Sequence, residues 1–296
     1  SWPLFAIGWV VGLLQQGSSA MLRIKRILDT PPCTGMLPDD TRTSVSLDGD
    51  IVFDNVTFHY NPEHSAVLQN LSFTIKRGET IALIGDSGSG KSTLLELLTR
   101  SYTPSSGKIT VNNYDISELP EFEVRSAMGV MPQIPVLFSQ TIRKNLEFGL
   151  NESANVSLDE ANRIACVQDD IDGFPQGMET RLGERGVNLS GGQKQRLTLA
   201  RAILRDPPIL LLDDPFASVD ISTEENILTN LPRVSKARTT IIVSHRVNTA
   251  KRADRVIVLS QGHKIEEGSH DELVEKGGYY TRLCRKQALL AELETY

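Results

Sequence analysis

The hydrophobic positions of the chain begin with an apolar run at residues 2–14, and a helical pattern with a polar face continues to residue 28. The apolar run is shorter than the roughly 20 residues that a membrane-spanning helix needs. Basic residues follow it, as is typical of the cytoplasmic end of such a helix: Arg23, Lys25 and Arg26. We interpret residues 1–28 as the end of a last transmembrane helix whose earlier part is missing. The alternative is an amphipathic docking helix of a soluble protein.

A different pattern follows a segment rich in Pro, Thr, Ser, Gly and Asp, residues 29–50, which we interpret as a linker. Apolar and polar positions then alternate through residues 51–53, 56–60 and 71–75, which predicts half-buried antiparallel strands. Residues 109–116 place Asn-Asn between two short apolar stretches, and this predicts a small hairpin with a primed turn.

Three short runs are almost wholly apolar, as strands buried on both faces of a parallel sheet are: residues 80–84, 209–212 and 239–243. Helical signals dominate from residue 117 to about 206 and suggest a helical insertion between core strands. Two late strands and a capping box that opens a last helix follow, at 256–259, 263–266 and 269–272. The pattern predicts an α/β domain over residues 51–296, with a mainly parallel sheet, an antiparallel β-subdomain and a helical subdomain.

Composition restricts the partners of this domain. The formal net charge of −6 argues against nucleic acid as the main partner, whereas phosphate binding needs only local positive charge. The three cysteines, Cys33, Cys166 and Cys284, are isolated and lack C-x-x-C spacing. We therefore expect reduced thiols rather than disulfides or a metal site.

One stretch fits the phosphate-loop pattern G-x-x-x-x-G-K-[ST]: Gly85-Asp86-Ser87-Gly88-Ser89-Gly90-Lys91-Ser92-Thr93. It lies between a buried run and leucines at helical spacing, so the helix N-terminus adds partial positive charge for an anion. We expect Lys91 to reach the β- and γ-phosphates and Ser92 to place its hydroxyl on Mg²⁺. The stretch thus predicts a nucleotide-binding P-loop NTPase core. A Gly/Ser-rich turn before an ordinary helix is the alternative.

Polar residues follow two of the buried runs at once, Asp213-Asp214 and Ser244-His245. Ligands of open α/β sheets bind at the carboxyl ends of the strands, so these residues and the phosphate loop should share one edge. Mg²⁺ prefers oxygen ligands, and we expect Asp213 to hold it directly or through water. The alternative is an Asp that starts a turn before Pro215.

A second candidate anion site, Leu189-Ser190-Gly191-Gly192-Gln193, precedes a clear helix. An N-cap with a flexible lead-in is the alternative. The segment is identical to the signature sequence of ABC ATPases, and other motifs resemble that family in order and spacing. By this resemblance Tyr60 stacks on adenine, Gln133 is the Q-loop glutamine that touches Mg²⁺, and His245 is the switch histidine. Two further segments are similar to the X-loop of exporters and to the D-loop: Gly183-Glu184-Arg185-Gly186 and Ala217-Ser218-Val219-Asp220.

The resemblance implies an exporter motor domain that uses ATP and Mg²⁺. Two such domains would form a head-to-tail dimer, in which Ser190 and Gly192 of one chain meet the γ-phosphate bound by the other. ATP closes the dimer, and hydrolysis reopens it and moves the membrane helices. The implied partners are a second half-transporter, the chain's own transmembrane domain, the lipid membrane and an unidentified transported substrate. The implied location is the plasma membrane, with this domain on its cytoplasmic face.

One position departs from the family. The general base of ABC ATPases is a Glu directly after the Mg²⁺ Asp, and here that position is Asp214. A base must lie within about 2.6–3.2 Å of the attacking water, and the shorter side chain withdraws the carboxylate by one carbon–carbon bond. We therefore predict slow hydrolysis at the site of this chain's own Lys91, as in the degenerate-site subunit of heterodimeric exporters. A small backbone shift that restores the reach is the alternative.

Two other functions are compatible with parts of the pattern. A nucleotide-binding regulatory subunit with negligible hydrolysis agrees with Asp214, but an intact signature, Gln133 and His245 disfavour it. A soluble ABC ATPase of DNA repair would insert a long coiled coil between Lys91 and Ser190, where none fits, and translation members carry two cassettes.

Overall fold

The computed structural model describes residues 2–30, 45–150, 155–232 and 238–294. It divides into two compact units, Ser1–Arg42 and Thr43–Tyr296. Most of the predicted linker, together with Cys33, lies outside the described residues.

The first unit consists of one continuous helix, α1 (Trp2–Leu28), of 27 residues. An 18-residue window of α1 has a mean hydropathy of 1.2, so this helix is long and apolar enough to cross a membrane by length and composition. None of its described side chains is buried, and Lys25 and Arg26 occupy its last turn.

The second unit contains a small antiparallel sheet, as predicted. Its strand order is β2-β1-β4-β5, formed by Leu68–Ile75, Ile51–Phe58, Ser106–Val111 and Tyr114–Asp115. The two alternating stretches expected at the start are one strand, β1, whose pairing shifts register around Asn55 (φ 49°). The predicted primed turn is confirmed, because Asn112 and Asn113 both have positive φ, 50° and 67°.

The large sheet is mainly parallel, which confirms the expected fold class. Its order is β10-β9-β3-β8-β7-β6, formed by His263–Gly268, Arg255–Ser260, Thr80–Gly85, Thr239–Val243, Ile209–Asp213 and Met128–Met131. β10 pairs antiparallel with β9, and the other neighbours are parallel.

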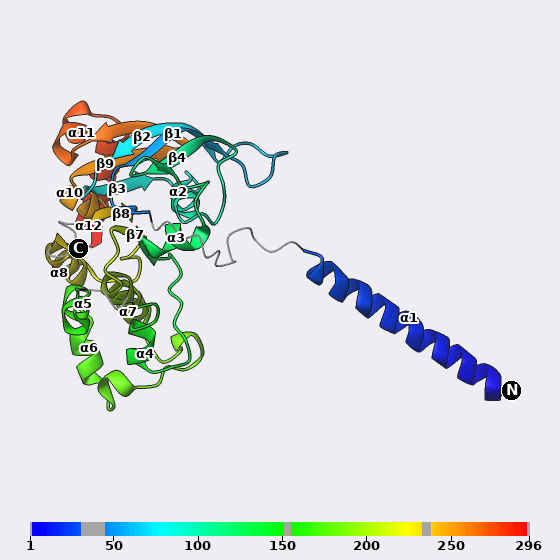
Figure 1. Cartoon of the computed structure of the whole chain (residues 1–296). Coiled ribbons are helices and arrows are strands. Elements are labelled where there is room, and N and C mark those ends of the chain that lie inside the picture. The colour runs from blue at the N-terminus through cyan, green and yellow to red at the C-terminus, as the bar shows by residue number, and fades with distance from the viewer. Residues whose placement is uncertain (1, 31–44, 151–154, 233–237, 295–296) are drawn as a thin grey trace. The chain divides into compact units, whose positions relative to one another are not determined.

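Strand β6 lies within the segment that we expected to be helical. It is only four residues long, too short for a hydrophobic period to identify, and it gains its stability by pairing with β7. Beyond β6, helices α4–α7 lie together away from the antiparallel sheet (Figure 1). The helices of the whole segment are α3 (Glu121–Ser126), α4 (Ile142–Leu146), α5 (Leu158–Ile164), α6 (Gln168–Gly173), η1 (Gly177–Glu179), η2 (Glu184–Gly186) and α7 (Gly191–Leu204).

The core is organised by the alternation of side chains along the large sheet. Ile209 and Leu211 of β7 join an apolar core that contains residues of both sheets and of α2 (Lys91–Leu98). Leu210 and Leu212 point to the opposite face and join a core with α4, α5 and α7. A parallel strand buried on both faces is therefore apolar throughout, as the sequence indicated.

Polar contacts also join the two sheets. Arg255, the first residue of β9, donates hydrogen bonds to the carbonyl oxygen of Thr74 in β2 at 2.5 Å and to Glu79 at 2.7 and 2.9 Å. It also forms an ion pair with Glu267 of β10. Lys264 of β10 donates to the carbonyl oxygen of Ser72 in β2 at 2.9 Å. The antiparallel sheet is thus fixed to the edge of the parallel one.

The C-terminal part adds α8 (Ile221–Asn230), α10 (Val247–Arg252), α11 (His270–Lys276) and α12 (Tyr279–Glu294). The predicted capping box of Ser269 and Glu272 is confirmed, but it opens α11 and not the last helix. Gly277, with φ 68°, ends α11, and α12 follows directly. Cys166 and Cys284 are free cysteines.

Candidate functional site

The loop between β3 and α2 has a conformation that depends on two of its glycines. Gly85 and Gly90 have φ of 157° and 98°. A Cβ at Gly85 would lie 2.1 Å from the carbonyl oxygen of Leu259, and one at Gly90 would lie 2.4 Å from Cδ2 of Leu68. The tight turn at the start of α2 therefore requires glycine at both positions.

The ammonium group of Lys91 folds back into this loop. Its Nζ donates hydrogen bonds to the carbonyl oxygens of Gly85 at 2.9 Å and Asp86 at 2.7 Å, and to Oγ of Ser89 at 3.3 Å. Burial lowers the pKa of Lys91, and the charge of nearby Asp213 opposes this shift. The cation is thus held at the centre of the loop, where it can attract the oxygens of a phosphate.

Asp213 ends β7 beside the start of α2. Its burial raises the pKa of the carboxyl above the usual 3.8, and the charge of Asp214 acts in the same direction, whereas a hydrogen bond from Ser92 lowers it. Among the described residues, no group of three or more His, Cys, Asp or Glu side chains could hold a metal ion. The oxygens of Ser92, Asp213 and Gln133 border one cavity, and this donor set fits Mg²⁺, which binds few protein ligands and also phosphate oxygens.

That cavity has a volume of about 320 Å³ and lies at the carboxyl ends of the parallel strands. Val67 and Val243 line it together with many of the predicted site residues: Tyr60, Ser87, Gly88, Gly90, Lys91, Ser92, Thr93, Gln133, Asp213, Asp214 and His245. The remaining predicted loop residues, Gly85, Asp86 and Ser89, belong to the same turn. The structure therefore brings together residues separated by up to 185 positions, from Tyr60 to His245.

Tyr60, two residues beyond β1, is held at the rim of the cavity by polar and aromatic contacts. Its hydroxyl donates to Glu96 of α2 at 2.6 Å and lies 2.9 Å from the hydroxyl oxygen of Thr93. Burial and this hydrogen bond to Glu96 raise the pKa of Tyr60 to about 12. The rings of Phe58 and Tyr102 contact it edge to face, and 52% of Tyr60 remains exposed. A half-exposed ring of fixed orientation is suited to stacking on a flat ligand.

Asp214 and His245 reach the cavity from the ends of two adjacent strands, β7 and β8. The backbone N–H of Asp214 donates to the carbonyl oxygen of Val243 at 3.0 Å, so the pairing of the strands continues to this residue. Asp214 has φ of 47°, a left-handed conformation that Asp adopts more readily than most residues. A carboxylate and an imidazole at this edge can accept or donate protons beside a bound phosphate.

The signature segment lies at the N-terminus of α7, and none of its four predicted site residues lines this cavity. Oγ of Ser190 accepts a hydrogen bond from the N–H of Gln193 at 3.2 Å, and Oε1 of Gln193 accepts from the N–H of Ser190 at 3.0 Å. This capping box uses the side chain of Gln193 within the chain, and its amide also donates to Asp170 at 3.0 Å. Ser190 and Gly191 are exposed and available to another molecule.

The two glycines of the signature also allow close packing against the segment that resembles the D-loop. A Cβ at Gly192 would lie 2.9 Å from the carbonyl oxygen of Ser218, and one at Gly191 would lie 3.1 Å from Cβ of Ser218. Gln195, one turn into α7, accepts a hydrogen bond from the N–H of Ser218 at 2.8 Å. Sequence reasoning missed Gln195, because nothing in its local pattern separates it from an ordinary helix residue.

Comparisons with known proteins show which family the chain resembles. A family model described as ABC transporter matches residues 68–217. The chain is 37% identical over 295 residues to a probable multidrug resistance ABC transporter ATP-binding/permease protein of Bacillus subtilis, covering 99% of this chain and 50% of that protein. It is 37% identical over 286 residues to an ATM1-type heavy metal exporter of Novosphingobium aromaticivorans, covering 97% of this chain and 47% of that protein.

Among solved structures, a bacterial Atm1-family ABC exporter with ATP bound is similar, with a TM-score of 0.84 and 37% sequence identity. The match covers 93% of this chain and 48% of that one. The chain thus spans about half the length of the curated relatives it matches.

Proposed function

The chain belongs to the ABC transporter family, and from this premise we propose that it is the ATP-binding and ATP-hydrolysing motor domain of a membrane exporter. The observation that carries the proposal is the single cavity in which Lys91, Ser92, Asp213 and His245 meet. A lysine within a glycine-rich loop suits a triphosphate, and the acidic residue beside the helix start suits its metal ion. The similar proteins are named as transporters, and this supports the proposal that ATP hydrolysis drives transport.

In this proposal the cavity holds ATP as the substrate. Lys91 binds the β- and γ-phosphates, and the exposed ring of Tyr60 stacks on the adenine. Ser92, Asp213 and Gln133 hold Mg²⁺, directly or through water, and when bound the ion neutralises phosphate charge. His245 lies at the cavity wall and hydrogen-bonds to the γ-phosphate.

The exposed start of α7 serves a second nucleotide. Ser190 and Gly191 are exposed and lie outside this chain's own cavity, so the hydroxyl of Ser190, the N–H of Gly191 and the helix dipole can face an anion on another chain. In a head-to-tail dimer, Ser190 contacts the partner's γ-phosphate, and Gly191, Gly192 and Gln193 support it. Each chain then uses its own cavity for one nucleotide and the start of its α7 for the partner's. ATP closes the dimer, and hydrolysis reopens it.

Hydrolysis at the cavity of this chain depends on Asp214. Its carboxylate accepts a proton from the attacking water, whose oxygen bonds to the γ-phosphorus as the bond to the leaving ADP oxygen breaks. Asp carries one methylene less than Glu, and a misplacement of about 1 Å can cost on the order of a hundredfold in rate. This site is therefore slow, and a heterodimer with a second half-transporter that carries Glu supplies the faster site.

Helix α1 supports the membrane part of the proposal, because its length and composition suit a membrane helix and its last turn is basic. The motor domain then lies on the cytoplasmic face of the plasma membrane and moves the chain's own transmembrane domain. The second candidate function is a regulatory subunit that binds ATP with negligible hydrolysis, and Asp214 is the observation that favours it.

The proposal is tested with the full-length protein, reconstituted with its counterpart, by Mg²⁺-dependent binding of a fluorescent ATP analogue. Lys91→Ala should weaken binding at least about tenfold, since it removes a charge-assisted contact to phosphate. Lys108→Ala, at an exposed position of β4, is the matched control and should bind as the wild type does. Equal binding by all three proteins, or none by the wild type, would contradict the proposal.

A further inference from the structure

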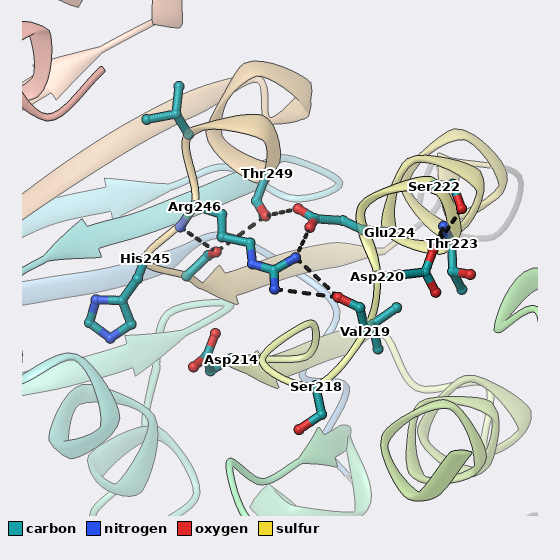
Figure 2. Close-up of polar contacts among 12 residues, drawn as sticks. Asp214, Ser218, Val219, Asp220, Ser222, Thr223, Glu224, His245, Arg246 and Thr249 are labelled. Atoms are coloured by element: carbon teal, nitrogen blue, oxygen red, sulfur yellow. Dashed lines mark hydrogen bonds and ion pairs between the residues drawn. The ribbon is translucent and has the colours of Figure 1, made fainter. Parts of the chain in front are cut away.

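Arg246 directly follows the proposed switch histidine, but its side chain leaves the loop in a different direction. In Figure 2 the ring of His245 and the guanidinium of Arg246 diverge, and the guanidinium points toward Val219 and Glu224. The side chains of these two neighbouring residues therefore lie in different places: His245 lines the cavity, and Arg246 contacts Val219 and Glu224.

The guanidinium binds the segment that resembles the D-loop, Ala217-Ser218-Val219-Asp220. Both Nη1 and Nη2 donate to the carbonyl oxygen of Val219 at 3.3 Å, and Nη1 also forms an ion pair with Glu224 in α8. Glu224 is fully buried, and its other carboxylate oxygen accepts a hydrogen bond from Thr249 at 3.2 Å. A buried carboxylate with a charged partner is held firmly, because removing the partner would leave an uncompensated charge.

The loop backbone is tied into the same network. The N–H of Arg246 donates to Oγ of Ser244 at 3.0 Å, and that hydroxyl donates to Thr249 at 3.2 Å. Ser244, Thr249 and Glu224 are almost completely buried. The backbone on both sides of His245 is therefore fixed relative to Glu224.

On its other side the D-loop segment contacts the signature helix. Ser218 donates its N–H to Gln195 of α7 and packs against Gly192. The segment therefore lies between two anchors, Arg246 from the switch loop and Gln195 from the signature helix. A displacement of His245 can be transmitted through Arg246 and Val219 to the exposed signature start.

We propose that Arg246 is a positioning residue that couples His245 to the D-loop segment and, through it, to the signature helix. This inference rests on the proposed function, in which His245 contacts this chain's nucleotide and Ser190 contacts the partner's. Arginine suits the task because its planar fork reaches a carbonyl oxygen and a carboxylate at once, whereas lysine offers a single point charge. When His245 contacts the γ-phosphate, the start of α7 is then held where Ser190 can contact the partner's nucleotide.

The test measures ATP turnover, the KM for ATP and the melting temperature of the full-length protein with its counterpart. Arg246→Lys should lower kcat about tenfold through lost positioning while KM changes less than about twofold. Arg252→Lys, an exposed arginine at the end of α10, the helix whose N-cap is Arg246, is the matched control and should leave all three values unchanged. An Arg246→Lys protein that behaves like this control would overturn the inference.

A second arm separates positioning from general stability. In a His245→Ala background, Arg246→Lys should lower kcat no further, because its effect runs through His245. If the two substitutions together lower kcat by the product of their separate factors, Arg246 has an independent structural role and the inference is overturned. Turnover insensitive to His245→Ala would contradict the proposed function itself, so the two failures are distinguishable.

If Arg246→Lys impairs folding, the double variant with Glu224→Gln and Arg246→Gln replaces it in the test. Removing both charges should restore the melting temperature, because no unpaired buried charge remains. Turnover should stay low, since glutamine is too short to bind Val219 as arginine does. Recovery of turnover together with stability would show that Arg246 only neutralises Glu224.

Discussion

The side-chain amide of Gln287 in α12 holds the backbone of His245 in place. Its Nε2 donates a hydrogen bond to the carbonyl oxygen of His245 at 2.5 Å, and its Oε1 accepts one from the N–H of Val247 at 2.9 Å. The C-terminal helix therefore fixes the loop around His245 by contacts that do not involve Arg246.

We expect Gln287→Ala to lower ATP turnover about three- to tenfold, because the backbone of His245 is then held less firmly and a misplaced group lowers the rate of the chemical step. Gln287→Glu should be at least as damaging, since a carboxylate cannot donate to the carbonyl oxygen of His245. The measurement is steady-state turnover with the counterpart present, and exposed Lys286→Ala is the neighbouring control. Full activity of both Gln287 variants would show that the loop needs no support from α12.

Asp214→Glu should raise ATP turnover by about ten- to a hundredfold, because it returns about one carbon–carbon bond of reach to the proposed base. Glu tolerates the φ of 47° at this position less well than Asp, so we also expect a loss of stability below about 1 kcal/mol. Phosphate release by the reconstituted pair measures the first effect and calorimetry the second. Turnover unchanged by Asp214→Glu and also by Lys91→Ala would favour the regulatory function.

Asp213→Asn should have opposite effects on Mg²⁺-ATP binding and on stability. Burial raises the pKa of Asp213 above 3.8, so its ionised form costs folding free energy, and stability is lost as the pH rises through the raised pKa. The variant measured without ATP should therefore melt higher than the wild type at pH 7, and the difference should shrink as the pH falls toward 3.8. Affinity for Mg²⁺-ATP should fall at least about tenfold, while ATP affinity in EDTA stays the same. An unchanged Mg²⁺ dependence would remove Asp213 from the metal site.

Two substitutions of Tyr60 separate the ring from its hydroxyl. Tyr60→Ala should weaken ATP binding by about 1–3 kcal/mol, the usual contribution of base–aromatic stacking. Tyr60→Phe keeps the ring and its edge contacts with Phe58 and Tyr102, so affinity should hold. It should lose about 1 kcal/mol of stability, since Glu96 loses its 2.6 Å hydrogen bond. Equal losses of affinity in both variants would assign the effect to the hydroxyl.

The sequence predicted those parts of the site whose signals are local. The β3–loop–α2 turn depends on consecutive residues, and the ends of β7 and β8 follow from apolar runs with polar residues directly after them. The sheet then determines that these ends meet, because neighbouring parallel strands present their carboxyl ends at one edge. The Asn112-Asn113 turn was predicted for the same reason, since the pair alone favours positive φ.

Features that depend on distant partners could not be predicted in this way. Strand β6 is too short to show a period, and it exists because β7 offers it a partner. The contacts of Arg246 with Val219 and of Gln287 with His245 join residues 27 and 42 positions apart. In the sequence, Arg246 and Gln287 look like ordinary surface residues, because only tertiary packing brings their partners within reach.

The contacts of Arg255 have a consequence for the thermal unfolding of the second unit, Thr43–Tyr296, referred to below as the cassette. Its bonds to Thr74, Glu79 and Glu267, together with the apolar core common to both sheets, leave the antiparallel sheet without an independent stability of its own. Calorimetry of the cassette should accordingly record one cooperative endotherm for both sheets. Arg255→Ala should broaden that endotherm or split it in two, the thermal signature of halves that no longer unfold together.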